Sequence, residues 1–230
     1  GGFAASASPL TVNIGGNLTP DTLQWTTGGF VSGTLILSSG TSLAEVNLIN
    51  SIDLFGSDRT IQVDTNSTTN SDLATLSGVI SNSTGTAGIV KAGSGILRIL
   101  ADNTYNGDTT IAGGTVRLVN IGDSTSTSSN FGTGAGKVSL NNATLAYVGG
   151  GETTDRLIEL GGSTQNALIE SSGSGALVLT NVVNVGTGAR NFYLRGDLNA
   201  ANEITSALAD GGGALSVVKD DNGTWILSGQ

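Results

Sequence analysis

The chain alternates short apolar patches with clusters of glycine, asparagine, serine and aspartate. Patches of this length, bounded by turn-forming residues, predict short β-strands. A helix would need apolar residues at every third and fourth position over about a dozen residues, which no window of this chain offers. Before residue 91 the expected strands lie within 10–14, 23–25, 35–37, 46–54, 61–63, 73–80 and 89–90.

The stretch 91–118 shows this pattern most clearly. Its apolar patches, 96–100, 109–111 and 115–118, are separated by Gly, Asn and Asp, which predicts three strands joined by two turns. We therefore expect one coil of a β-solenoid here. Glycines stand at the expected corners, where the chain needs positive φ or room for a neighbouring backbone. They are Gly93, Gly95, Gly107, Gly113 and Gly114.

These residues resemble the autotransporter-associated β-strand repeat of bacterial surface proteins. Its pattern is Lys-x-Gly-x-Gly-x-Leu-x-Leu, then Asn-Thr-Tyr-x-Gly-x-Thr-Thr-Ile, then Gly-Thr-Leu. Val116 replaces the final Leu, and Leu100 replaces a usual small polar residue. The resemblance implies a right-handed parallel β-helix in a secreted, extracellular protein of the bacterial cell surface. The matching positions are Lys91, Gly93, Gly95, Leu97, Ile99, Asn103, Thr104, Tyr105, Gly107, Thr109, Thr110, Ile111, Gly114 and Thr115.

A weaker pattern indicates that a module of about 130 residues occurs twice. Leu35 aligns with Leu168, Gly28-Gly29 with Gly161-Gly162, and Lys91 with Lys219. Gln230 falls at the position of Asp102, so the second copy stops within a repeat. The predicted organisation is a single continuous solenoid over residues 1–230, with internal modules 1–133 and 134–230.

Stacked coils would bury one face of every strand, which isolated short hairpins cannot do. At roughly 20–25 residues a coil, we expect about ten parallel coils in a rod on the order of 50 Å long. No cap is apparent at either end, so both end coils are expected to be open and to pair with further strands. The side chains expected to face inward are Ile52, Leu54, Ile61, Val63, Ile89, Leu97, Ile99, Ile111, Val183, Val185, Leu194, Val217, Trp225 and Leu227.

Composition narrows the function classes. The chain has 36 Gly but also a positive mean hydropathy, which favours a folded chain over a disordered one. A net charge of −9 argues against nucleic acid or an anionic membrane surface as partner. Absence of Cys excludes disulfides, and no apolar run is long enough to cross a bilayer. The start, Gly-Gly-Phe-Ala, has no initiator Met and no signal peptide, so we expect a piece of a larger protein.

The rival to a structural role is a carbohydrate-active β-helix. It would need paired carboxylates some 5–9 Å apart, and aromatic rings along the same cleft. The acids do not recur between the aligned copies, because Asp220 and Asp221 replace Ala92 and Gly93. Solvated turn residues are the favoured interpretation. The acids considered are Asp53, Asp58, Asp64, Asp102, Asp108, Asp220 and Asp221, and the rings are Trp25, Tyr105, Tyr147 and Trp225.

Other chemistry finds little support. Segments 102–108 and 220–223 offer oxygens for calcium but lack the nonapeptide spacing of calcium-binding β-rolls. Without His or Cys the usual nucleophilic triads are excluded, and the glycines of 132–137 lack phosphate-loop spacing. Ser-Lys chemistry is left formally open for Ser42, Ser94 or Ser216 with Lys91 or Lys219. We assign no catalytic, cofactor-binding or metal-binding residue, and no cofactor.

Polar residues in turns have structural interpretations. Asn103 is expected to hydrogen-bond neighbouring backbone at a corner, and 122–130 is the best candidate for a mobile surface loop. Five Asn-x-Ser/Thr triplets mark candidate glycan positions, although about five are expected by chance. They begin at Asn17, Asn66, Asn82, Asn142 and Asn222.

The sequence therefore predicts a structural or adhesive, non-enzymatic segment of a large secreted cell-surface protein, part of an extended rod or filament. The expected partners are further copies or further repeats of the same protein, stacked end to end. Surface polysaccharide is a second candidate partner. Nucleic acid, and membrane insertion by this segment, are not expected.

Overall fold

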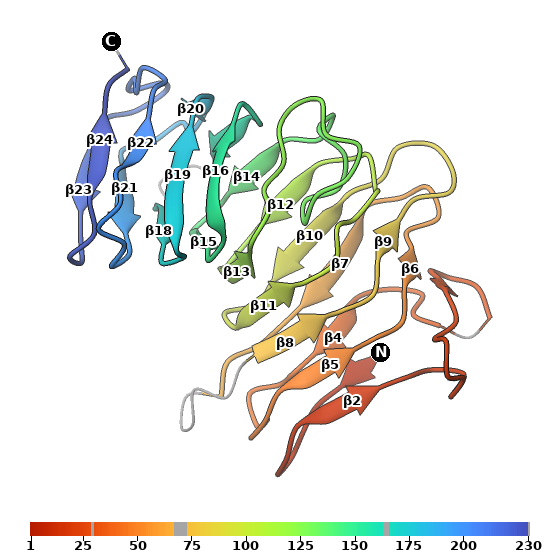
Figure 1. The fold of residues 1–230 in the computed structure, drawn as a ribbon. Helices are drawn as coiled ribbons and strands as arrows, with labels where there is room; N and C mark the ends of the chain where they lie inside the picture. Colours follow the sequence, from red (N-terminus) through yellow and green to blue (C-terminus); the bar gives the residue numbers. More distant parts are fainter. Residues whose placement is uncertain (29, 67–72, 163–165, 230) are drawn as a thin grey trace.

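The computed structural model describes residues 1–28, 30–66, 73–162 and 166–229. Figure 1 shows strands stacked in chain order, from the red N-terminal end to the blue C-terminal end. No helix among the described residues could span a lipid bilayer. Gly29 and Gln230, which entered the repeat alignment, lie outside the described residues.

Each turn of the chain adds one strand to each of two long sheets, and some turns add a third strand. The first sheet holds β1 (Gly2–Phe3), β4 (Leu35–Leu37), β7 (Arg59–Gln62), β10 (Ile89–Ala92), β12 (Thr109–Ile111), β14 (Val138–Leu140), β17 (Ile158–Leu160) and β20 (Val182–Asn184). The second sheet holds β2 (Leu10–Val12), β5 (Val46–Leu48), β8 (Leu73–Leu76), β11 (Ile96–Ile99), β13 (Gly114–Leu118), β15 (Ala143–Tyr147), β18 (Ala167–Ser171), β21 (Arg190–Arg195) and β23 (Leu215–Lys219).

Two smaller sheets complete the turns. One lies in the N-terminal half and holds β3 (Leu23–Gln24), β6 (Ile52–Asp53) and β9 (Ile80–Ser81). The other lies in the C-terminal half and holds β16 (Gly150–Thr154), β19 (Gly175–Leu179), β22 (Asn202–Ile204) and β24 (Trp225–Leu227). The named strands pair in parallel, for example β10 with β12 and β11 with β13. The chain is therefore an all-β parallel solenoid, as predicted.

The solenoid has about eight turns, fewer than the ten expected. Turn length varies more than the strand pattern suggested. Ile96 pairs with Thr115, a turn of 19 residues, whereas Leu10 pairs with Val46, a turn of 36 residues. The number of turns is lower than expected because some turns contain long connecting segments. Eight strand spacings make a rod of roughly 40 Å.

Alternate residues of each strand fill the interior. In β11, Leu97 and Ile99 are buried while Ile96 and Arg98 are partly exposed. Most side chains predicted to face inward are at most 1 % exposed, which confirms the strand periodicity. They are Ile52, Leu54, Ile61, Val63, Ile89, Leu97, Ile99, Ile111 and Leu194.

The prediction was wrong for Val183 and Val185, which are 42 % and 47 % exposed. In β20 the inward positions belong to Val182 and Asn184. The Asn184 side-chain amide binds the next coil, because Nδ2 donates to the carbonyl oxygens of Ala209 (3.3 Å) and Asp210 (2.6 Å). This polar contact fixes the strand in the opposite phase to the one that hydrophobicity alone indicated.

Val217 and Leu227 are 38 % and 50 % exposed, also against expectation. They nevertheless occupy inward-facing positions of their strands, since they pair with the buried Phe192 and Ile204. They belong to the last described coil, and no described residue packs over it. Trp225, in the same coil, is half-buried. The division into two modules stays a prediction. The sequence alignment behind it matches strands of different sheets, because β10 lies in the first sheet and β23 in the second.

Candidate functional site

Asp53, a candidate acid, joins three successive coils. Its carboxylate accepts hydrogen bonds from Gln24 Nε2 (3.2 Å), from the Phe55 amide (3.0 Å), and from the amide (2.9 Å) and hydroxyl (2.6 Å) of Ser83. Burial by itself raises the pKa of Asp53, but these hydrogen bonds outweigh it and hold the pKa below its usual value. Its lone pairs are engaged between coils, which makes it a structural residue.

Asp58 and Asp108 occupy equivalent positions, each just before a strand of the first sheet. Asp58 accepts the amide of Gly88 (2.8 Å), and Asp108 accepts the amide of Lys137 (3.1 Å), one coil further on in each case. Asp102 accepts Nδ2 of Asn120 (3.0 Å). The acids are thus spread along the rod and bind coil to coil.

Lys91 is fully buried, and its ammonium lies among backbone carbonyls. Nζ donates to the carbonyl oxygens of Ala92 (3.0 Å) and Gly93 (2.8 Å) in its own coil and of Gly113 (3.0 Å) in the next. Burial lowers the pKa of Lys91 to about 8, and the charge of Asp64 opposes that shift. No described serine hydroxyl binds this amine, so the Ser-Lys arrangements considered for Lys91 are not formed.

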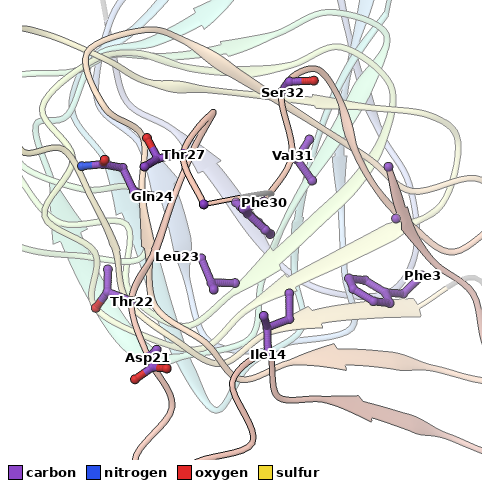
Figure 2. A pocket seen from close by; sticks show the side chains of 13 residues that line it. Phe3, Ile14, Asp21, Thr22, Leu23, Gln24, Thr27, Phe30, Val31 and Ser32 are labelled. Carbon is purple, nitrogen blue, oxygen red and sulfur yellow. The ribbon is translucent and has the colours of Figure 1, made fainter.

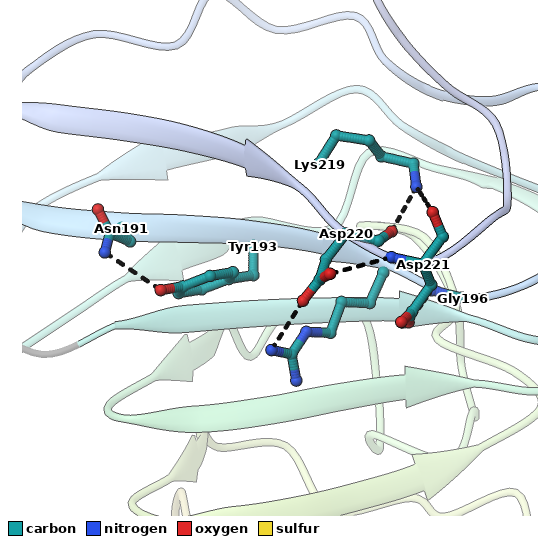
Figure 3. Close-up of polar contacts among 7 residues, drawn as sticks. Asn191, Tyr193, Gly196, Lys219, Asp220 and Asp221 are labelled. Carbon is teal, nitrogen blue, oxygen red and sulfur yellow. Dashed lines mark hydrogen bonds and ion pairs between the residues drawn. The ribbon is translucent and has the colours of Figure 1, made fainter.

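The turn at Lys219 repeats this geometry in the last described coil (Figure 3). Lys219 Nζ donates to the carbonyl oxygens of Asp220 and Asp221, the next two residues, as Lys91 does. Asp221 has φ 58°, matching Gly93 at φ 78° in the earlier turn. Among the described residues no third carbonyl covers Lys219, because no coil lies over it. Segment 220–223, which was considered for calcium but lacks the required spacing, thus belongs to a turn closed by Lys219.

Asn103 has the structural role predicted for it. Its side chain is fully buried, Oδ1 accepts the amide of Ile80 (2.7 Å), and Nδ2 donates to the carbonyl of Asn130 (2.7 Å). It therefore ties its own turn to the coils on either side.

Segment 122–130 lies at the surface in its middle, as predicted, since Asp123, Ser124 and Thr125 are exposed, while its two ends pack against the rod. Ser129 and Asn130 are fully buried. Asp155 accepts both the amide and the hydroxyl of Ser124 (2.6 Å each), and Glu152 accepts the amide of Gly122 (2.6 Å). Burial raises the pKa of Glu152, and the amides of Ile121 and Gly122 partly offset the rise. Contacts from later coils hold this loop, and its composition alone does not reveal them.

Arg156 completes this packing and was missed by sequence reasoning. It is 1 % exposed, and Nη1 donates to the carbonyls of Thr133 (2.9 Å) and Gly136 (2.8 Å), with Nε directed to Gly122 (3.3 Å). Burial lowers the pKa of Arg156. An arginine following Asp155 in a turn carries no sequence signal that distinguishes it from a surface residue.

The aromatic rings do not form a platform. Trp25, Tyr105 and Tyr147 are at most 1 % exposed. Trp25 Nε1 donates to the Gly33 carbonyl (3.1 Å), and its ring meets Phe30 edge-on at 5.6 Å. Of the rings considered for sugar binding, only Trp225 reaches the surface in part.

A hollow of about 600 Å³ lies at the N-terminal end of the rod (Figure 2). Phe3, Ile14, Leu23 and Phe30 line it, with Asp21 as its single acid. A smaller hollow of about 300 Å³ contains Asp108 and Asp155 but no ring. Neither combines two acids with two rings. The described residues also contain no cluster of three or more acids that could hold a metal.

Of the candidate glycan positions, Asn17, Asn142 and Asn222 are exposed, and Asn82 is half-buried. Asn66 is 3 % exposed, and the two residues that complete its triplet lie outside the described ranges.

Comparison with known proteins supports these observations. Residues 89–118 match the family model described as Passenger-associated-transport-repeat. The chain is 38 % identical over 114 residues to the Adhesin BmaC autotransporter of Brucella suis biovar 1 (strain 1330), a match covering 47 % of this chain and 3 % of that protein. No solved structure gives a significant match. The turn from β10 to β13, with its caged lysine and bridging asparagine, is thus an autotransporter passenger repeat.

Proposed function

We propose that this chain is a segment of the elongated solenoid of a secreted bacterial surface protein, with a structural or adhesive role and no catalytic one. The similarity to an autotransporter adhesin is the observation that carries this proposal. The engagement of the buried polar groups supports it, because Asp53, Lys91 and Asn103 all bind neighbouring coils. Such residues hold successive coils of a rod together.

We further propose that its immediate partners are more coils of the same kind, stacked on β23 and β24. Three features support this. Val217 and Leu227 have inward phase but are exposed, the outer edges of both strands are unpaired among the described residues, and Lys219 lacks the third carbonyl that Lys91 has. A further coil stacked there would cover the two exposed side chains, pair with the two strand edges and offer a third carbonyl to Lys219.

An in-frame deletion of this segment from the surface protein, displayed on its own cells, tests the role. We expect normal export, a surface structure shortened by roughly 40 Å, and weaker adhesion to host or abiotic surfaces. Release of reducing ends when the purified chain is incubated with polysaccharides would instead indicate an enzyme. The absence of any change in length or adhesion would contradict the proposal.

Stacking is tested with the purified chain by sedimentation over a range of concentrations. We expect end-on self-association that Val217→Asp with Leu227→Asp abolishes. The matched control is Val183→Asp with Val185→Asp, which adds the same charge to outward-facing valines. A strictly monomeric chain whose β24 amides are protected from hydrogen exchange would contradict this proposal.

A further inference from the structure

The outward side of the second sheet carries a column of side chains in cross-strand register. Arg98 pairs with Arg117, Arg117 with Ala146, Ala146 with Glu170, and Glu170 with Arg195. Adjacent members of the column are about 4.8 Å apart along the rod. Because this side is parallel to the rod axis, coils added at either end would leave it exposed.

The three arginines of this column differ in their partners. The guanidinium of Arg195 forms an ion pair with Asp220 (3.1 Å) and lies over the ring of Tyr193 at 5.2 Å. Neither Arg98 nor Arg117 has an ion pair with any described residue. Like charges directly opposite each other on neighbouring strands are destabilising, so this pair opposes folding unless an anion joins it.

The arginine pair has apolar neighbours further along its strands, whereas Thr75 pairs with Arg98 on its other side. Leu100 and Val119, each two residues beyond a paired arginine, are 49 % and 46 % exposed. The strand pairing ends before them, since the Val119 amide donates to Asn130 Oδ1. The outward-facing Ala146, which pairs with Arg117 on the next strand, is fully buried. The nearby acid Asp102 is bound to Asn120.

We propose that Arg98, Arg117, Leu100 and Val119 form a lateral binding site for a carboxylate-bearing sugar. A guanidinium donates two parallel hydrogen bonds to a carboxylate, and two stacked guanidinium groups can grip it from adjacent coils. The two aliphatic side chains offer a surface for the apolar face of a sugar ring. The chain's net charge of −9 disfavours extended polyanions, so a single terminal acidic sugar fits best.

This site rests on the adhesive role proposed above, but a soluble probe tests it independently of the full surface protein. The probe is sialyllactose, with lactose as the uncharged control, titrated into the purified chain and followed by ligand-observed NMR and calorimetry. We expect sialyllactose to bind and lactose not to bind. Arg98→Gln and Arg117→Gln should each weaken binding at least about tenfold, and the double variant should abolish it.

The matched control is Arg195→Gln, which removes an arginine of the same column whose charge is already compensated and should leave binding unchanged. Arg98→Lys with Arg117→Lys keeps the charge but removes the bidentate fork, and should also weaken binding. Circular dichroism verifies that each variant is folded. The proposal is overturned if sialyllactose binds no better than lactose, if the Gln variants bind normally, or if only sulfated polymers or acidic peptides bind.

Discussion

Lys91→Met tests how a buried charge is balanced inside the rod. Methionine has a similar length but no donor, so the carbonyls of Gly93 and Gly113 would lose the only hydrogen bond that the described residues give them. An unsatisfied buried acceptor costs about 1–3 kcal/mol. Removing the ammonium also removes the net penalty for its charge, which the fall in pKa from 10.5 to about 8 places at about 3 kcal/mol with the attraction of Asp64 included. At pH 7 we expect a net destabilisation of no more than about 3 kcal/mol.

The pH dependence gives the sharper result. Because the pKa of Lys91 is lower in the folded state, the unfolded chain binds more protons between pH 8 and 10.5. The wild-type chain should therefore become more stable through this window, whereas the Met variant lacks this contribution. By linkage, the difference in unfolding free energy between the two should grow by about 2 kcal/mol from pH 7 to pH 9.5.

Urea denaturation followed by circular dichroism at pH 7, 8.5 and 9.5 measures this difference. Lys219→Met is the matched control, since Lys219 makes the same local turn but is exposed. It should show no such growth. A difference that stays flat or narrows between pH 7 and 9.5 would mean that the carbonyl cage favours the ammonium outright, and would refute the reasoning.

Three further substitutions probe other interactions. Arg156→Met should destabilise the chain by about 3–5 kcal/mol and raise hydrogen exchange selectively within 122–136; uniform exchange changes would argue against a local role. Asn103→Ala should lower the free energy of unfolding by about 2–4 kcal/mol, measured by denaturation. The control Asn120→Ala removes an exposed hydrogen bond and should lower it by less than about 1 kcal/mol. Equal losses in the two variants would contradict the bridging role of Asn103. Gly114→Ala (φ +62°) would bring Cβ to 2.7 Å from the Gly93 carbonyl, whereas Gly85→Ala (φ +61°) meets open space. Both variants carry the strain of positive φ, about 1 kcal/mol, so the close approach of Cβ to backbone is the difference between them. We expect Gly114→Ala to have the lower melting temperature. Similar melting temperatures would show that the close approach does not destabilise the chain.

The sequence predicted the strands because their periodicity is local. Leu97 and Ile99 alternate with partly exposed residues, and two nearby glycines mark the turn before them, so residues 91–118 were sufficient to infer a coil. The structural role of Asn103 followed from its corner position. These inferences need no knowledge of what lies in the next coil.

The errors arise where a distant coil decides the outcome. Asn184 takes the inward position of β20 because backbone carbonyls more than twenty residues later accept its amide. Segment 122–130 is a surface loop, and its sequence does not reveal that Glu152, Asp155 and Arg156 of the following turn anchor it. A hydrophobicity pattern does not predict such interactions, because polar side chains form them. The spacing along the sequence gives no guide either, since the turns of the solenoid vary from 19 to 36 residues.

The passenger repeat specifies how coils join, and that limits what a match to it can say about binding. Its polar residues Lys91, Asn103 and Tyr105 are buried, and each is hydrogen-bonded within or between coils. Arg98 falls at a variable position of the repeat pattern, Arg117 follows its last specified residue, and Val119 lies beyond the matched residues 89–118. Substitution at these outward positions leaves the buried hydrogen bonds intact, so two proteins can share the rod and differ in what its side binds. Adhesive specificity in such a chain should therefore be sought in outward columns of adjacent coils, where parallel stacking sets side chains from different turns about 4.8 Å apart.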